Sequence, residues 1–180
     1  MVINGTLRTL LLTALLGAQA AHADTVSQNF TVNASIIKGC VLGSGVTNVT
    51  SFGSMSFGQV ASLSSPIKIV SSAGAGSILI RCNPGLSVTL GLNVGNNVTG
   101  SIAGGRKLLN SVTSETLIYQ LYQDANYAVL WGDGGNGGAV QTVSSTGSTQ
   151  EIKIYASLMA SSTLPTSGTY NDTVLVTVSY

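Results

Sequence analysis

The chain has 180 residues, of which only 7% are charged, with seven Lys plus Arg against six Asp plus Glu. Typical soluble domains carry about 25% charged residues, so the polarity of this chain comes instead from 24 Ser and 19 Thr. Nucleic-acid binding needs clustered Lys and Arg, which this sequence lacks. Because 44% of the residues are hydrophobic, charge-driven disorder is excluded as well.

The first 23 residues have the pattern of a secretory signal. Arg8 precedes a short apolar run that ends in Ala21-His22-Ala23, a tripeptide typical of cleavage sites. A signal anchor is the competing interpretation, but the apolar run is short. Cleavage after Ala23 leaves 157 residues (180 minus 23) and removes the only histidine of the chain. We therefore expect the mature protein to be exported.

Residues 25–36 alternate between polar and apolar side chains, which predicts a β-strand of about 12 residues with one face on a core. All odd positions are polar, and the even positions are Val26, Gln28, Phe30, Val32, Ala34 and Ile36. The segment has no proline and no charge, the devices that usually protect an edge strand. It is either a first strand paired within its own sheet or a strand that pairs with another molecule.

A period of two continues along the rest of the chain. Clear alternation predicts strands at 86–94, 150–158 and 173–180, and shorter patterns predict strands at 66–71, 76–82, 116–123 and 127–131. Clusters of Gly, Asn and Ser separate them as turn signals. No ten-residue stretch after the signal has the 3.6-residue period of a helix. Several short strands at this spacing predict a single antiparallel β-sandwich domain.

Cys40 and Cys82 are the two cysteines of the chain. An even number of cysteines in an exported protein predicts a disulfide, and two free thiols are the alternative. In the chain-entropy model, closing the loop of about 43 residues contributes about 4 kcal/mol. Either state has a structural role and no catalytic one.

Removal of the only histidine, His22, excludes Ser-His-Asp and Cys-His catalysis and histidine-ligated zinc. The spacing of the remaining carboxylates suggests no glycosidase pair. They are Asp24, Glu115, Asp124, Asp133, Glu151 and Asp172. The loop 131–138 has a single Gly-Asp motif, whereas calcium binding needs tandem copies, so a hairpin loop is the better interpretation. We expect no catalytic residue, no cofactor and no metal.

A series of motifs follows the first cysteine in a distinctive order. The series is Phe52-Gly53-x-x-x-Phe57-Gly58, Arg106-Lys107-Leu108, Tyr119-Gln120-Leu121-Tyr122-Gln123-Asp124, Trp131-Gly132-Asp133-Gly134 and Gly168-Thr169-Tyr170-Asn171-Asp172-Thr173-Val174. With the two cysteines and the signal, this order resembles the spore coat protein U domain family, which includes subunits of archaic, Csu-type chaperone–usher pili. The resemblance covers the mature chain to its end. Ala156-Ser157 departs from a Gly-Arg pair common in the family, which leaves the type of subunit open.

The resemblance implies an all-β fold, an incomplete immunoglobulin-like antiparallel β-sandwich that is completed by a donor strand. It divides the chain into a signal peptide (1–23), an N-terminal donor strand (24–36) and a pilin domain (37–180). The donor strand carries the even-numbered side chains given above. The missing last strand would leave a hydrophobic groove beside the C-terminal strand, lined by Val174, Val176, Val178 and Tyr180.

The function implied by the resemblance is that of a structural pilus subunit that supports adhesion and biofilm formation. Its partners would be a periplasmic chaperone, an outer-membrane usher and neighbouring subunits in a head-to-tail polymer at the cell surface. Such a heterologous contact does not close and therefore builds a filament. Two alternatives remain open: a self-sufficient secreted coat or matrix protein, and a carbohydrate-binding module that uses Tyr119, Tyr122, Tyr127 and Trp131.

Overall fold

The computed structural model describes residues 27–180, so the expected signal peptide and Val26 lie outside the described residues. The compact body runs from Ile36 to Tyr180, and residues 27–35 belong to a separate unit. Residues 27–38 are all exposed, and no strand is formed there. The period of two at 25–36 therefore does not yield a strand within 27–36 of this single chain, because a strand needs a partner for its backbone groups.

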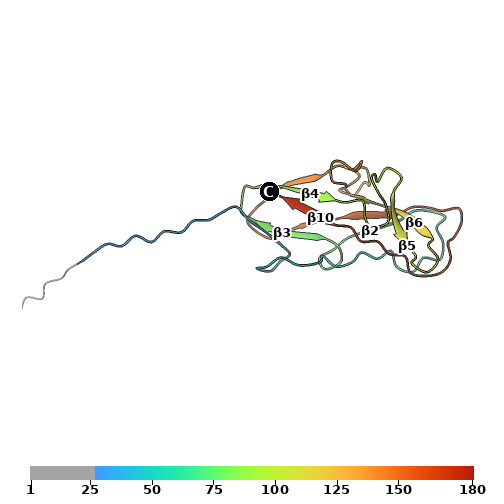
Figure 1. The fold of residues 1–180 in the computed structure, drawn as a ribbon, viewed down its shortest axis with the longest axis horizontal. Coiled ribbons are helices and arrows are strands. Elements are labelled where there is room, and N and C mark those ends of the chain that lie inside the picture. Colours follow the sequence, from blue (N-terminus) through green and yellow to red (C-terminus); the bar gives the residue numbers. More distant parts are fainter. Residues whose placement is uncertain (1–26) are drawn as a thin grey trace, which may run out of the picture. The chain divides into compact units, whose positions relative to one another are not determined.

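Ten short strands make up the body within residues 27–180, and all their pairings are antiparallel (Figure 1). The three sheets have the orders β1-β3-β8, β2-β9-β6-β5 and β10-β4-β7. The strands are β1 Cys40–Leu42, β2 Ile67–Val70, β3 Ile78–Cys82, β4 Ser87–Leu92, β5 Arg106–Leu109, β6 Thr116–Tyr122, β7 Gln141–Ser144, β8 Gln150–Ile152, β9 Tyr155–Leu158 and β10 Val176–Ser179. Among the described residues, no helix is long and apolar enough to cross a membrane.

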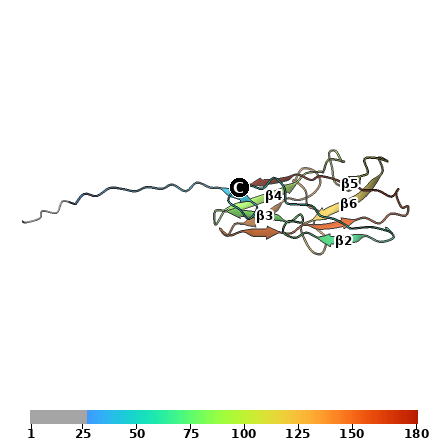
Figure 2. The same cartoon turned by 90° about the horizontal axis from the view of Figure 1, so that it is seen from below.

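The first two sheets follow one another along a single extended run, because only Lys153 and Ile154 separate β8 from β9. β3 pairs with β8, and β2 pairs with β9. The interruption has a local cause: Ile154 donates its amide to the Ser71 hydroxyl at 2.7 Å, and Ser71 donates its amide back to the Ile154 carbonyl at 2.9 Å. The sheet of β10, β4 and β7 covers the core from the other side, and β2 lies below β4 in Figure 2.

The core is built from the alternating positions of the strands, as the period of two predicts. β3 buries Ile78, Ile80 and Cys82, and β4 buries Val88, Leu90 and Leu92. The predicted disulfide is confirmed: Cys40 and Cys82 are bonded, and they stand directly opposite each other where β1 pairs with β3. The all-β, antiparallel architecture is confirmed as well.

Three strands lie outside the regions that alternation predicts. β1 has only three residues, β5 begins with the fully buried Arg106, and β7 contains one apolar residue, Val143. None of them shows an apolar period of two, because tertiary contacts decide their conformation.

The prediction of a strand at 127–131 is wrong. Tyr127 has a φ of 58°, in the left-handed region that a strand does not use. The Asp124 carboxylate accepts the amides of Ala128 and Val129 and so closes a loop. Leu130 and Trp131 form isolated bridges only.

Candidate functional site

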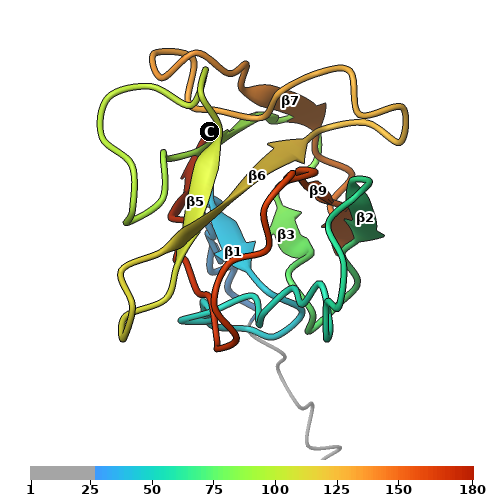
Figure 3. The same cartoon turned by 90° about the vertical axis from the view of Figure 1, so that its right-hand side faces the viewer.

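An open groove with a volume of about 1400 Å³ runs through the body. Its floor consists of core side chains, among them Leu92, Leu121 and Leu158, and its two walls are the segments 49–60 and 164–176. Pockets for small molecules usually measure about 300–1,000 Å³. This groove is larger, and its shape between two chain segments suits a polypeptide. In Figure 3 the red segment that leads into β10 runs down the front of the body, apart from the teal connection between β1 and β2.

The wall formed by 164–176 ends in β10, the edge strand of its sheet. The Asn93 amide donates to the Leu175 carbonyl at 3.1 Å, and the register pairs Val176 with Leu92. Because antiparallel pairing alternates, the backbone groups of Val174, Val176 and Val178 point away from β4. Within residues 27–180, β10 pairs with β4 and with no other strand. One edge of this strand is therefore free to pair.

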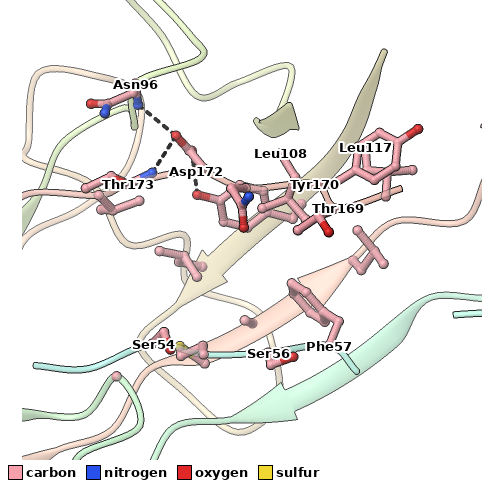
Figure 4. Close-up of a pocket in the computed structure, with 18 of the residues that line it drawn as sticks. Ser54, Ser56, Phe57, Asn96, Leu108, Leu117, Thr169, Tyr170, Asp172 and Thr173 are labelled. Atoms are coloured by element: carbon pink, nitrogen blue, oxygen red, sulfur yellow. Dashed lines mark hydrogen bonds between the residues drawn. The ribbon is translucent and has the colours of Figure 1, made fainter. Parts of the chain in front are cut away.

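The opposite wall carries a second unpaired extended stretch at 54–57. Met55 and Phe57 point inward and are half-buried, whereas Ser54 and Ser56 are exposed. This is the alternation of a strand, yet the structure gives these four residues no backbone–backbone hydrogen bond. Figure 4 shows Ser54, Ser56 and Phe57 across the space from Thr169 and Asp172. Two unpaired strand edges thus line the same groove.

Asp172 fixes the start of the last strand. Its Oδ1 accepts the amides of Asn96 and Thr173, both at 2.8 Å, and its Oδ2 accepts the Tyr119 hydroxyl at 2.7 Å (Figure 4 shows the first two). Burial, followed by the hydrogen bond to Asp172, raises the pKa of Tyr119, so its hydroxyl stays protonated and donates. The ring of Tyr119 also meets Phe57 edge-on, with centroids 6.5 Å apart, and so connects the two walls.

The buried guanidinium of Arg106 supports the same wall from behind. It donates to the carbonyls of Asn93 (2.8 and 3.1 Å) and Trp131 (2.8 Å). Since the Asn93 carbonyl is occupied, the Leu175 amide pairs with the Asn93 side-chain oxygen at 2.9 Å. Arg106 thereby positions the residue that precedes β10.

Glu115 holds the outer part of this wall. Its Oε2 accepts the Thr166 amide at 2.9 Å, and the Tyr170 hydroxyl lies 3.1 Å from it and 2.8 Å from the Thr166 carbonyl. The hydrogen bonds from Thr166 are the main cause that lowers the pKa of Glu115. The segment 164–170 is thus attached to the turn between β5 and β6.

The groove includes part of the predicted row of the last strand. Val174 and Val176 line it, whereas Val178 and Tyr180 do not. Val174, Val176 and Val178 are half-buried against the core, and Tyr180 is 57% exposed. The structure places the described residues of the predicted donor strand in solvent: Phe30 is 87% exposed and Ile36 86% exposed, with Gln28, Val32 and Ala34 also exposed. Their role as a donor strand stays a prediction.

The aromatic platform considered for sugar binding is not formed by the four residues named. Trp131 is fully buried, with its indole N–H donating to the Leu90 carbonyl, and Tyr119 is buried too. The Tyr127 ring instead meets the rings of Tyr122 and Tyr155 in edge-to-face contacts. The Lys68 ammonium covers the Tyr127 ring at 4.2 Å, so this ring offers no free face on that side.

The Gly-rich loop 131–138 is closed by its own hydrogen bonds. Asp133 Oδ1 accepts the amides of Gly135 and Asn136, both at 2.8 Å, and Asn136 Oδ1 accepts the amides of Asp133 and Gly138. The carboxylate that a cation would need is therefore engaged by the backbone. In residues 27–180, no three His, Cys, Asp or Glu side chains gather as a metal site would require.

Comparison with known proteins decides the family. The model of the Spore Coat Protein U domain matches residues 26–177, nearly the whole of the chain. The chain belongs to the Spore Coat Protein U domain family. Protein U of Myxococcus xanthus is 28% identical over 178 residues, which is 93% of this chain and 92% of that protein.

A solved structure is also similar. It is a chaperone–tip adhesion subunit pre-assembly complex, CsuC–CsuE, from the archaic chaperone–usher Csu pili of Acinetobacter baumannii. The similarity has 16% sequence identity and a TM-score of 0.49, and it covers 81% of this chain and 41% of that one.

In this Spore Coat Protein U domain, the motifs that carry the family resemblance meet around the groove. Arg106, Tyr119 and Trp131 connect the loops behind the wall, and Asp172 receives the Tyr119 hydroxyl. Sequence reasoning missed the wall at 54–57 and its inward side chains, Met55 and Phe57. The signal was present, because Ser, Met, Ser and Phe alternate there over four residues, but so short a run is weak evidence by itself.

Proposed function

We propose that this protein is a structural subunit of a secreted surface filament, in which the N-terminal strand of one copy fills the groove of the next. The observation that carries the proposal is the pair of unpaired strand edges, at 54–57 and along Val174 and Val176, on either side of the groove. An extended segment between them would satisfy both edges. Such a segment would complete the sandwich.

The chain itself contains a suitable occupant. Residues 25–36 present apolar side chains at five of the six even positions, and the described ones are exposed. Burying Phe30, Val32 and Ile36 contributes roughly 1.5–3 kcal/mol each, or about 5–9 kcal/mol in total. Ordering of the strand and loss of free motion oppose this gain, so the net affinity is smaller. The contact is head-to-tail and therefore propagates into a filament.

The remaining roles follow from the pilin family that the sequence resembles. A periplasmic chaperone would occupy the groove before assembly, and an outer-membrane usher would exchange its strand for that of the next subunit. Export through the periplasm to the cell surface, and support of adhesion and biofilm formation, belong to the same proposal. The role is structural and needs no catalytic residue.

Deletion of residues 25–36 tests this function. The deleted subunit should form no fibres, seen by electron microscopy, while its body still binds the chaperone in a pull-down assay. Fibres that persist without the segment would show that it is not the donor strand.

A matched pair of variants tests whether fibre formation needs the apolar side chains of residues 25–36 and not only the presence of the segment. Phe30→Ser with Ile36→Ser removes two groove-facing side chains and should abolish fibres. Thr31→Ala with Asn33→Ala changes only the polar face and should leave fibre formation within about twofold of the unaltered chain, since surface changes of this kind have small effects.

A second function, that of a self-sufficient coat protein, is favoured by the description of the family. It predicts a stable monomer that needs no chaperone and gains nothing from an added strand. Expression of the mature chain alone distinguishes the two functions: a soluble monomer with a groove that binds no peptide supports the coat protein.

A further inference from the structure

The wall 49–60 contains a short internal repeat. Ser51-Phe52-Gly53 and Ser56-Phe57-Gly58 stand five residues apart, and both adopt the same local structure. In each unit the serine hydroxyl oxygen accepts the amide of the glycine two residues later, at 3.1 Å. Both glycines have left-handed backbones, with φ values of 86° and 76°.

Each unit interrupts the extended conformation of the wall. A glycine at positive φ turns the chain out of the strand direction, as in a β-bulge. Its amide is also engaged by the serine, so it is not available to a neighbouring strand. What remains between the two interruptions is 54–57, the unpaired stretch whose side chains alternate between outward and inward.

The inward side chains of this stretch are fixed by the groove. Met55 fills the space beside Gly76, where an added Cβ would lie 2.2 Å from the Met55 Cγ. Phe57 meets the Tyr119 ring edge-on. The two side chains therefore form fixed positions between which the side chains of an inserted strand must fit.

We propose that the two Ser-Phe-Gly units are register stops: they limit backbone pairing on this wall to 54–57, so that the N-terminal strand of a second copy enters the groove in one register only. This inference rests on the proposed function and specifies how the same groove selects its strand. Neither β10 nor the backbone of 54–57 alone would fix the register, since a strand shifted by two residues makes the same backbone bonds and keeps its apolar face inward. The fixed side chains of Met55 and Phe57, held between the two units, make the registers different.

Gly58 is the position at which the inference can be tested cleanly. No heavy atom of the chain lies within 4 Å of the place a Cβ would take there, so a substitution disturbs no neighbouring side chain of the wall. Gly53 is unsuitable, because its Cβ would lie 2.0 Å from the Gly74 carbonyl oxygen. Gly100 is a matched control: it has a φ of 78°, it is equally open, and it does not line the groove.

Two labelled peptides of residues 24–37 serve as probes, and fluorescence anisotropy on the mature chain gives their dissociation constants. One has the natural sequence, and the other exchanges Phe30 with Val32, so composition is unchanged while the ring moves by two positions. The natural chain should bind the natural peptide at least tenfold more tightly. Gly58→Val should reduce the ratio of the two dissociation constants to about threefold or less, because a β-branched residue disfavours positive φ. Gly100→Val should leave this ratio unchanged.

Two further variants keep the test decisive if Gly58→Val fails to fold. Gly58→Asn, a residue that tolerates the left-handed region, should preserve the ratio, and Ser56→Ala, which removes only the hydroxyl bound to the Gly58 amide, should lower it. An unchanged ratio in both Gly58→Val and Ser56→Ala, or no preference in the natural chain, overturns the register stops but leaves strand insertion intact. Failure of both peptides to bind a mature chain that sedimentation shows to be monomeric overturns the proposed function and this inference together.

Discussion

At the scale of single residues, the buried guanidinium of Arg106 is the group whose chemical identity matters most. Desolvation lowers the pKa of this group, while Tyr119, Asp172 and Asp133 act in the opposite direction. Its closest hydrogen-bond partners are the Asn93 and Trp131 carbonyls. A guanidinium can reach several carbonyls at once through its planar array of N–H groups, which a lysine ammonium cannot reproduce. The position therefore requires arginine specifically.

Arg106→Met should destabilise the body by about 2–4 kcal/mol, because it leaves the buried Trp131 carbonyl and the half-buried Asn93 carbonyl without donors. Urea denaturation checks this through a lower midpoint at an unchanged slope. Lys107→Met, which removes the neighbouring exposed cation, should change stability by less than about 0.5 kcal/mol. Equal effects of the two substitutions would contradict the role of the carbonyl contacts.

Tyr119→Phe removes one hydroxyl and keeps the ring that faces Phe57. Because the hydroxyl donates to a carboxylate at 2.7 Å, we expect a loss of about 1.5–3 kcal/mol in urea denaturation. Tyr127→Phe is the control, since that hydroxyl has only a 3.4 Å contact with the Ile69 carbonyl. A loss for Tyr127→Phe as large as that for Tyr119→Phe would count against a special role of Asp172.

At the scale of strands, alternation of apolar residues predicted β2, β3, β4, β6 and β10 and the run that contains β8 and β9, because one face of each strand lies on the core. It did not predict β5, where a charged residue occupies a core position, nor the loop at 127–131. The loop depends on Asp124, whose pKa is lowered chiefly by the Val129 amide that it accepts. Such contacts across several residues have no periodic signal.

The disulfide makes a strand of three residues sufficient. β1 pairs with β3 over Cys40–Leu42, and the bond joins its first residue to the last residue of β3. Cys40→Ala with Cys82→Ala should lower the free energy of unfolding by about 4 kcal/mol, since the open loop regains its entropy in the unfolded chain. In urea denaturation, a reductant should lower the stability of the natural chain by the same amount as the double substitution. The reductant should not change the stability of the double variant.

The attachment of segment 164–170 by Glu115 should depend on pH. Because hydrogen bonds, above all from Thr166, lower the pKa of Glu115 in the folded state, its contribution is complete above the unfolded pKa and is lost as the pH falls through the folded one. Glu115→Gln should therefore lower the Tm at pH 7, and the difference from the natural chain should shrink as the pH falls below the unfolded Glu pKa of about 4.3. A Tm difference that is the same at pH 7 and pH 3 would show that the carboxylate charge is not involved.

Glu151→Gln provides the control for this pH dependence. Glu151 is exposed, and the structure shows no hydrogen bond from its side chain within residues 27–180. The substitution should leave the Tm nearly unchanged at both pH values.

At the scale of the whole molecule, the two cysteines predicted the disulfide, whereas a groove beside the last strand was only what the family resemblance implied, and neither indicated the wall at 54–57. The row at Val174 and Val176 was visible because it alternates, whereas the wall at 54–57 is too short and is interrupted by Gly53 and Gly58. The hydrogen bonds that position the wall 164–176 join residues far apart in the chain, such as Tyr119 and Asp172, and a periodic pattern contains no information about them.

An open groove in the body and an apolar segment outside it make a linked variant informative. A copy of residues 25–36, appended after Tyr180 through a short Gly-containing turn, would run antiparallel to β10 as in a hairpin. Because the added strand covers the free edge and buries its apolar side chains, we expect a monomer in sedimentation that is several kcal/mol more stable in urea, less than the gross 5–9 kcal/mol. The same construction with Phe30→Ser and Ile36→Ser in the appended copy should gain little. Equal stability of the two linked proteins would mean that the groove does not accept this segment.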